Sequence, residues 1–223
     1  MGISGNAETD ELVKRLDTLY SAVITDILDD FDLWNQVMDK SIRPIYPGAR
    51  IIGRAVTFIA HEVTEVPEKP FAKLIELIDS LEPSDVIVGT VNERQASAMW
   101  GDLCATAASV RGAKGLIVEG ALRDVDRIQS IRFPVFSTGI TPADSKGRSD
   151  ITDLNIPVKC GGVNVFPGDL IIADSDGITV IPQDKAEEVI GHAEEKCSGE
   201  NTVRNELEAG RKLKDVFEEF KVL

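Results

Sequence analysis

A helical repeat of apolar residues opens the chain. Leu12 and Leu16 lie four residues apart, and further apolar residues continue the repeat. Because residues three and four apart share one face of a helix, residues 9–31 are predicted to form two helices. Thr9 is predicted to cap the first helix and Ser21 the second, since a hydroxyl there accepts hydrogen bonds from the free amides of the first turn.

Short apolar runs and helical patterns alternate through the middle of the chain. The β-branched and apolar runs predict strands at residues 51–63, 85–89, 115–120 and 134–139. A helical repeat starting at Phe71 predicts a helix that ends near Pro83, and residues 102–111 predict another. Strands that alternate with helices in this way favour a parallel sheet.

The pattern changes in residues 158–182. Apolar runs alternate there with the turn sequences Pro-Gly-Asp and Asp-Ser-Asp-Gly, which predicts a strand–turn–strand–turn–strand meander and a second β layer. The Asp-Ser-Asp-Gly segment begins like a calcium loop but lacks the later glutamate, so a hairpin turn is predicted. The C-terminal residues have helical spacing, and Gly210 is predicted to end a helix. The chain is therefore predicted to be a single domain, 1–223, with N-terminal helices at 1–40 and a helical extension at 184–223.

The charge of the chain narrows the classes of function. Asp and Glu number 38 against 24 Lys and Arg, a net charge of −14. Such a surface repels phosphate backbones, so no nucleic-acid binding is expected, whereas a basic protein partner would be attracted. No apolar run reaches the roughly 20 residues of a membrane span, so no membrane association is expected. The three cysteines form no paired motif and no signal peptide is evident, which predicts a reduced, cytoplasmic protein.

Several common catalytic motifs do not occur. His61-Glu62 lacks the second histidine of a zinc protease, and the P-loop, dinucleotide-binding and Gly-x-Ser-x-Gly patterns are missing. His61 and His192 are the only histidines, so a Ser–His or Cys–His catalytic pair is disfavoured. Lys114 enters a strand rather than leaving one, which disfavours Schiff-base chemistry. The remaining candidates for catalytic groups are carboxylate and arginine side chains.

Two segments carry that chemistry, WGDLCATAASVRG (100–112) and VEGALRDVDR (118–127). Asp102 lies where a loop enters a helix, and Arg123-Asp124 lie just past the end of a strand. In α/β architectures, sites assemble outside the carboxyl ends of strands. These three residues are therefore the candidate catalytic group.

The residue types permit a specific reaction. The Asp124 carboxylate, supplemented by waters, suits Mg²⁺, which takes few protein ligands. The Arg123 guanidinium can hydrogen-bond a 2-oxo oxygen that becomes an enolate when the adjacent carbon–carbon bond breaks. The free amides of Leu103 and Cys104 can donate hydrogen bonds to the substrate carboxylate. The alternative is structural: Arg123 and Asp124 form a surface ion pair, and Asp102 caps its helix.

The chain also resembles a known family, the class II aldolases acting on 4-hydroxy-4-methyl-2-oxoglutarate together with the related regulator of ribonuclease activity A. The resemblance covers most of the chain. It rests on YPGARIIGRAVTF, on the two segments above, on FPVFSTG and on GGVNVFPGDLIIADSDGITVIP. The aldolases' D-x20-R-D arrangement is met by Asp102, Arg123 and Asp124.

The resemblance implies an α/β chain with the three-layer β/β/α swivelling-domain fold and N- and C-terminal helices. It implies a homotrimer or homohexamer with active sites between subunits. A divalent metal, Mg²⁺ or Mn²⁺, would be held by Asp124, and Arg123 would contact a pyruvate-like group. Gly101, with the amides of Leu103 and Cys104, would complete the substrate site.

The resemblance also implies a glutamate lent by a neighbouring subunit, and alignment of ENTVRNELEAG with that region suggests Glu200 as a catalytic residue. The preceding Cys-Ser-Gly (197–199) departs from the family pattern and is expected to break the helix there. Glu119 stands where the family often has aspartate; it is assigned no role, and its side chain is expected to point away from the site.

The predicted function is that of a metal-dependent class II aldolase. It would cleave 4-hydroxy-4-methyl-2-oxoglutarate-type substrates to pyruvate and decarboxylate oxaloacetate, because both reactions leave a pyruvate enolate. Asp102 is the candidate for proton transfer. Two alternatives stay open: a non-enzymatic binding protein that regulates a ribonuclease, and a related lyase that acts on another 2-oxo acid.

Overall fold

The computed structural model describes residues 4–91 and 97–221, and a mixed sheet lies at its centre. The strands of this sheet are β1 (Arg43–Pro44), β2 (Ile51–Glu62), β3 (Asp85–Val91), β4 (Ala98–Trp100), β5 (Gly115–Leu122), β6 (Val135–Ile140), β7 (Ser149–Leu154), β10 (Leu170–Ala173) and β11 (Ile178–Ile181). Their order is β1-β6-β5-β3-β2-β10-β11, with β4 also paired to β5 and β7 to β2.

The centre of the sheet is parallel, as predicted. Neighbours β2, β3, β5 and β6 all run the same way, and β4 is parallel to β5. The four strands predicted from the apolar runs are β2, β3, β5 and β6, so those predictions are confirmed. Strands β4 and β7 were not predicted. Because the central strands are parallel, their carboxyl ends meet at one edge of the sheet, where the candidate residues follow β4 and β5.

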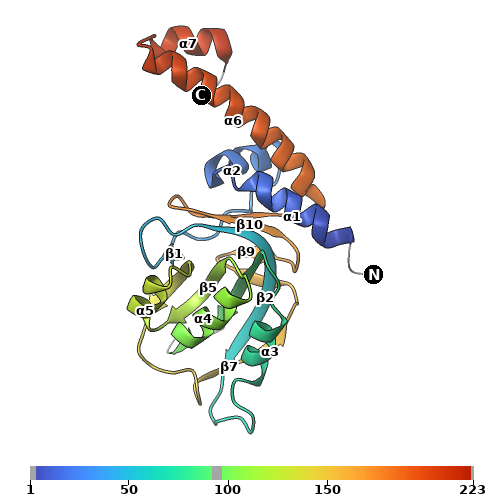
Figure 1. The fold of residues 1–223 in the computed structure, drawn as a ribbon, viewed down its shortest axis with the longest axis vertical. Coiled ribbons are helices and arrows are strands. Elements are labelled where there is room, and N and C mark those ends of the chain that lie inside the picture. The colour runs from blue at the N-terminus through green and yellow to red at the C-terminus, as the bar shows by residue number, and fades with distance from the viewer. Residues whose placement is uncertain (1–3, 92–96, 222–223) are drawn as a thin grey trace.

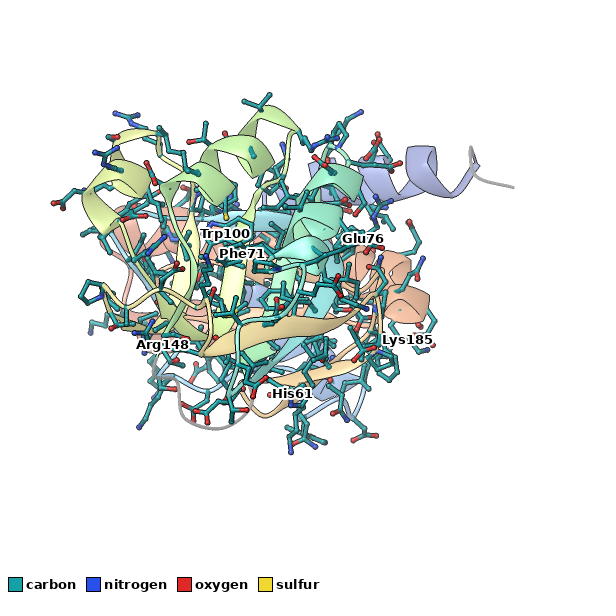
Figure 2. The ribbon with its side chains drawn as sticks, turned by 90° about the horizontal axis from the view of Figure 1, so that it is seen from below. His61, Phe71, Glu76, Trp100, Arg148 and Lys185 are labelled. Carbon is teal, nitrogen blue, oxygen red and sulfur yellow. The ribbon has the colours of Figure 1, made fainter. Side chains whose placement is uncertain are left out.

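Three helices cover one face of the sheet: α3 (Ala72–Ser80), α4 (Asp102–Val110) and α5 (Val125–Ser130). Figure 2 shows them together on one side of the strands. Their buried side chains, such as Leu77 and Ala105, pack against Phe58, Leu116 and Val135 of the sheet in one core cluster. The helices α4 and α5 begin just past the carboxyl ends of β4 and β5.

A second β layer lies on the opposite face. The hairpin of β8 (Val158–Cys160) and β9 (Val163–Val165) packs its valines against Ile117 and Phe136 of the central strands. The meander predicted for residues 158–182 was therefore partly wrong. Its first strand is this two-stranded hairpin, while β10 and β11 join the main sheet beside β2 through the Asp-Ser-Asp-Gly hairpin turn. The layers follow the expected β/β/α order.

The terminal helices form a third packing unit against β2, β10 and β11. They are α1 (Ser4–Leu16), α2 (Ser21–Asp30), the 3-10 turn η1 (Gln183–Lys185), α6 (Ala186–Glu208) and α7 (Leu213–Phe220). The first half of α6 packs on α1 and α2, and Figure 1 shows its far half, with α7, standing clear of the sheet. In the described ranges, no helix is long and apolar enough to cross a membrane.

Three details of these helices differ from the sequence predictions. The first helix begins at Ser4, so Thr9 lies inside it and does not cap it. Tyr20 is the cap residue of α2, and Ser21 is its first helical residue. The helix α6 runs without interruption through residues 197–199, so the expected break there was wrong, because a single central glycine costs a helix only about 1 kcal/mol. The break falls at Gly210 instead, as predicted.

Candidate active site

The two candidate segments meet because β4 and β5 are parallel neighbours. Trp100, at the end of β4, lies opposite Leu122 at the end of β5. The chain then continues into Gly101 and α4 on one side and into Arg123 and α5 on the other. The Arg123 N–H donates to the Trp100 carbonyl oxygen at 3.0 Å. Local pairing of two strand ends therefore brings Asp102 and Arg123, which have 20 residues between them in the sequence, to one place.

Asp124 has a backbone conformation that few non-glycine residues adopt. Its φ of 62° and ψ of 35° place it in the left-handed region, where it forms the start of α5. Aspartate tolerates this region better than most residues, but the conformation is still costly and persists where the surroundings fix it. The turn directs the carboxylate toward α4, and its Oδ2 accepts the Asp102 N–H at 3.2 Å.

Gly101 provides the room for this carboxylate. A Cβ at Gly101 would lie 2.6 Å from Asp124 Oδ2, too close for real atoms. The φ of Gly101 is −145°, which any residue can adopt, so the constraint is contact rather than backbone strain. Gly101 is therefore required by its neighbour, and any larger residue would displace the Asp124 carboxylate.

Asp102 does not cap its own helix. Gly101 is the cap residue of α4, Asp102 is the first helical residue, and no side-chain hydrogen bond caps this end from Gly101. The Asp102 carboxylate instead lies 3.4 Å from Nη1 of Arg127, which is largely exposed. The part of the structural alternative in which Asp102 caps its helix is therefore wrong, whereas the ion pair between Arg123 and Asp124 is present. The backbone N–H of Asp102 binds Asp124, and its carboxylate makes one ion pair with an exposed arginine.

Arg123 lies between two carboxylates without a close hydrogen bond to either. Its Nε is 3.7 Å from Asp124 Oδ2, and its Nη2 is 3.6 Å from Asp144 Oδ1. Both distances exceed those of good N–H···O hydrogen bonds. The side chain is 38% exposed. The guanidinium is thus held electrostatically in position while its planar set of donors stays available to a ligand.

These residues line one pocket of about 290 Å³. Its polar lining residues are Asp102, Arg123, Asp124, Asp144 and Ser145, together with Gly101. Its apolar lining residues come from α3, the end of β4 and the start of α4. Two of these apolar residues, Phe71 and Trp100, are labelled in Figure 2. The volume is near the lower limit of typical small-molecule sites, which suits a small acid.

Leu103 and Cys104 follow Asp102 in the first turn of α4, and both line the pocket. Their amides are among those that lack an intrahelical acceptor, and no described residue accepts a hydrogen bond from them. Burial raises the pKa of the Cys104 thiol above its usual range. Cys104 is therefore a neutral thiol at pH 7, which does not favour nucleophilic chemistry there.

Glu200 does not line this pocket. It lies on α6, where it accepts a hydrogen bond from the Tyr20 hydroxyl. Burial, followed by this hydrogen bond, raises the pKa of Tyr20 to about 12, so the phenol keeps its proton. Within one chain, α6 packs with α1 and α2 and not with the helix layer of the pocket. A role for Glu200 therefore requires another chain and stays a prediction.

Glu119 also lies outside the pocket. Its Oε2 accepts the Gly161 N–H at 2.8 Å, which ties β5 to the turn between β8 and β9. The side chain thus points to the second β layer, as expected. The cysteines at positions 104, 160 and 197 are all free, so the prediction of no disulfide framework is confirmed.

The sequence reasoning missed several residues of the pocket. Asp144 and Ser145 lie in the loop after β6, and Asp144 is held beside β4 by a bridge to Ala98. The rule that sites lie beyond the carboxyl ends of strands, extended to the strand at 134–139, points to this loop but not to a particular residue in it. The apolar residues of α3 carried no such signal, because core and pocket residues look alike in a helical repeat.

The donor set fits one kind of metal. Among residues 4–91 and 97–221, no group of three or more His, Cys, Asp and Glu side chains could hold a metal. In these residues this excludes a metal site with three or more such protein ligands. It does not exclude Mg²⁺, which keeps most of its waters and binds through one or two carboxylates. Asp124 Oδ2 is engaged by the Asp102 amide, whereas no described residue donates a hydrogen bond to Oδ1. The contact between Gly101 and Asp124 fixes the carboxylate for such a role.

The chain is similar to several known proteins. A family model described as "RraA-like: Aldolase/RraA" matches residues 21–180. A Halalkalibacterium halodurans protein named "Putative 4-hydroxy-4-methyl-2-oxoglutarate aldolase" is 33% identical over 186 residues, 83% of this chain and 83% of that protein. Protein DlpA of Legionella pneumophila is 32% identical over 94% of this chain, but the match spans only 34% of DlpA, about a third of its length.

The solved structures give the same grouping. Streptomyces coelicolor RraAS2, described as an unusual member of the RNase ES inhibitor RraA protein family, superposes with a TM-score of 0.77 at 27% identity. The superposition covers 87% of this chain and 96% of that one. The fold is thus shared with a solved relative over most of this chain.

Proposed function

The chain belongs to the RraA-like family of aldolases and RraA proteins, and from that premise we propose that it is a carbon–carbon lyase. It cleaves 4-hydroxy-2-oxo acids of the 4-hydroxy-4-methyl-2-oxoglutarate type to pyruvate, and it decarboxylates oxaloacetate. One observation carries the proposal: Asp102, Arg123 and Asp124 converge on a single pocket at the carboxyl ends of two parallel strands. Both reactions leave a pyruvate enolate, so the same residues serve both.

Arg123 stabilises the enolate in this proposal. Its guanidinium is placed by Asp124 and Asp144 at 3.7 and 3.6 Å, and its donors remain available. As charge develops on the 2-oxo oxygen, a fixed cationic donor stabilises the transition state more than the ground state. The substrate carboxylate is held on the amides of Leu103 and Cys104, at the positive end of α4.

Asp124 is the residue that would hold a divalent ion, Mg²⁺ or Mn²⁺. When bound, such an ion supplies positive charge that polarises the 2-oxo group. Asp102, beside Asp124, moves the proton of the 4-hydroxyl group through a water, a role worth roughly 10²–10⁴-fold in rate. The bond electrons go to the enolate, which takes a proton at its terminal carbon to give pyruvate.

The active unit in this proposal is a homotrimer or homohexamer. The support is the position of Glu200, which lies on α6 away from the pocket of its own chain. In an oligomer, α6 of one chain can approach the pocket of the next and add a carboxylate to it.

The experiment is an assay of the purified protein for pyruvate release. Oxaloacetate and 4-hydroxy-4-methyl-2-oxoglutarate are supplied with Mg²⁺, and the panel is extended to other 2-oxo acids because a relative acting on a different one stays an alternative. Dialysis against a chelator is expected to abolish pyruvate formation, and Mg²⁺ or Mn²⁺ to restore it. Full activity of the metal-free protein would refute the metal dependence, and no pyruvate from any acid would refute the lyase.

A second function, binding to a ribonuclease, is favoured by the net charge of −14, which suits a basic protein partner. The relative RraAS2 is described as belonging to a family of RNase ES inhibitors. Ribonuclease activity is measured with the wild-type protein and with Arg123→Ala. Inhibition that persists in the catalytically dead variant would support the binding function independently of the lyase.

A further inference from the structure

We propose that Asp144 is a positioning residue for the reaction: it orients the guanidinium of Arg123 and does not itself touch the substrate. This inference rests on the proposed lyase function and adds a residue to the site of that reaction. Asp144 lies in the loop between β6 and β7 and lines the same pocket as Arg123. Three features carry the inference: the partner of its carboxylate, its charge, and the way its backbone is held.

The Asp144 carboxylate has one partner in the described ranges. Its Oδ1 lies 3.6 Å from Nη2 of Arg123, and no residue in those ranges donates a hydrogen bond to this carboxylate. The Asp124 carboxylate lies 3.7 Å from Nε of Arg123, but it also accepts the Asp102 N–H and is the proposed metal ligand. Because two nitrogens of one planar group face two carboxylates, both the direction and the rotation of the guanidinium are restricted. Asp144 is the carboxylate that acts on Arg123 alone.

The charge of Asp144 separates positioning from binding. Asp102, Asp124 and Asp144 all line a pocket that is proposed to hold an anionic 2-oxo acid. A third carboxylate there repels the substrate carboxylate, because like charges at short range raise the free energy of the complex. Its attraction for Arg123 is favourable, and it would also offset the repulsion between Arg123 and a divalent ion on Asp124. The charge therefore opposes substrate binding but helps to direct Arg123.

The backbone of Asp144 is held from two sides. The Ala98 N–H donates to the Ala143 carbonyl oxygen at 2.8 Å, and residues 98 and 144 form a parallel bridge. On the other side, Nη1 of Arg148 donates to the Asp144 carbonyl oxygen at 2.8 Å. Asp144 is therefore tied to β4, the strand that pairs with β5 just before Arg123.

The end of the same loop is also anchored to β4. The buried hydroxyls of Ser97 and Ser149 form a hydrogen bond at 2.7 Å, and the Ser149 hydroxyl donates to Sδ of Met99 at 3.0 Å. Three successive residues, 97 to 99, are thus bound to the loop. A carboxylate on a loop fixed in this way can act as a stationary point of attachment for a long arginine side chain.

The kinetic test replaces Asp144 by asparagine, which keeps the shape of the side chain and removes its charge. The kcat for oxaloacetate is expected to fall at least about tenfold, because a misplacement of about 1 Å can cost about 10²-fold in rate. The KM is expected not to rise, since one repulsive charge has left the pocket. Asp144→Glu restores the charge and should bring kcat to within about threefold of the wild type. A raised KM with a normal kcat, or asparagine and glutamate variants that behave alike, would overturn the inference.

Asp153→Asn is the matched control. Asp153 is exposed on β7, does not line the pocket, and its carboxylate makes no hydrogen bond to a described residue. The substitution removes the same charge, so kcat and KM are expected to match those of the wild type. An equal loss of kcat in both asparagine variants would show a general effect of net charge and refute the assignment to Asp144. Circular dichroism checks each fold, and Asp144→Ala, for which the same loss of kcat is expected, replaces an asparagine variant that does not fold.

A double-mutant cycle tests whether Asp144 acts through Arg123. In Arg123→Lys the planar group that Asp144 orients is absent, so the addition of Asp144→Asn should lower kcat by less than about twofold. A further tenfold loss in that background would show that Asp144 acts independently of Arg123, which would refute the positioning role.

The last experiment needs no turnover and observes the Arg123 side chain itself. Nitrogen-15 NMR follows the Nε–H signal of Arg123, assigned by its loss in Arg123→Lys. We expect an ordered signal in the wild type and in Asp153→Asn, and a lower order parameter in Asp144→Asn. A lower order parameter in a protein that releases no pyruvate would refute the lyase function while the positioning of Arg123 stands. An unchanged order parameter in an active lyase would refute the positioning.

Discussion

At the scale of single residues, the chemistry depends on how Asp124 and Arg123 are held. The carboxylate of Asp124 is oriented by the left-handed backbone of that residue and by its contact with Gly101. Arg123 lies between Asp124 and Asp144. Asp102, Arg123 and Asp124 were identified from the sequence because each follows a predicted strand or begins a predicted helix. Asp144 was missed because the loop after β6 gives no indication of which residue returns to β4.

Arg123→Lys is expected to act mainly on kcat. Lysine keeps the charge but loses the planar set of donors that lies between Asp124 and Asp144. The loss should be about 10²-fold or more, as for removal of an oxyanion donor. Steady-state kinetics with oxaloacetate measure it. A variant with a normal kcat and only a raised KM would show that Arg123 binds substrate without stabilising the enolate.

Two substitutions of Cys104 test whether the substrate carboxylate lies on backbone amides. Cys104→Ala keeps the amide and should leave the KM for oxaloacetate within about threefold, less than the ~1.4 kcal/mol of a tenfold change. Cys104→Pro removes one donor in the first turn, where proline is tolerated, and should weaken pyruvate binding. Circular dichroism checks the fold of both. Normal pyruvate binding by a folded proline variant would place the carboxylate elsewhere.

At the scale of elements, the predictions succeeded where an element has a long apolar pattern. They failed where an element forms only because it pairs with a neighbouring strand. The parallel strands were found because each is a continuous buried run. β4, with three residues, and α5, with six, are too short to show a period. They exist because β4 pairs with β5 and because Asp124 turns the chain. The cap of α2 was missed for a similar reason, since it comes from a distant turn.

The first turn of α2 is capped by hydrogen bonds to the Asp174 carboxylate, from the turn between β10 and β11, and not by the side chain of the cap residue Tyr20. The Asp174 carboxylate accepts the Ser21 N–H at 2.8 Å and the Ser21 hydroxyl at 2.7 Å, and it also accepts the Asp176 N–H at 3.0 Å. Asp174→Ala should therefore lower the free energy of unfolding by about 1–2 kcal/mol, as loss of a helix cap does. Denaturant unfolding measures the change.

Asp176→Ala is the matched control in the same turn. Its side chain is exposed and its carboxylate makes no hydrogen bond to a described residue, so the substitution should change stability by less than about 0.5 kcal/mol. If both alanine variants lose the same stability, the turn itself, and not the contact between Asp174 and α2, is responsible.

At the scale of the whole molecule, the sequence predicted a helical extension but not where it lies. The far half of α6 and α7 stand clear of the sheet (Figure 1). Leu213 and Phe217 of α7 remain 50% and 41% exposed, so this part of the chain presents apolar surface that one chain does not cover. A periodic pattern reveals that a helix has an apolar face, but it does not reveal whether that face meets the same chain or another.

The last prediction is that the pocket of one chain and Glu200 of another form a single site. Light scattering is expected to give at least a trimer. Asp124→Ala chains lack a working pocket but keep Glu200, and Glu200→Ala chains keep the pocket. When the two are co-expressed, sites that combine an intact pocket with an intact Glu200 should restore about a quarter of wild-type activity in a randomly mixed ring. Co-expression of Asp124→Ala with Asp102→Ala is the control, because no intact pocket remains and no activity should return. No recovery in mixed oligomers verified by mass, alongside weak activity of each variant alone, would show that Glu200 does not act across the interface.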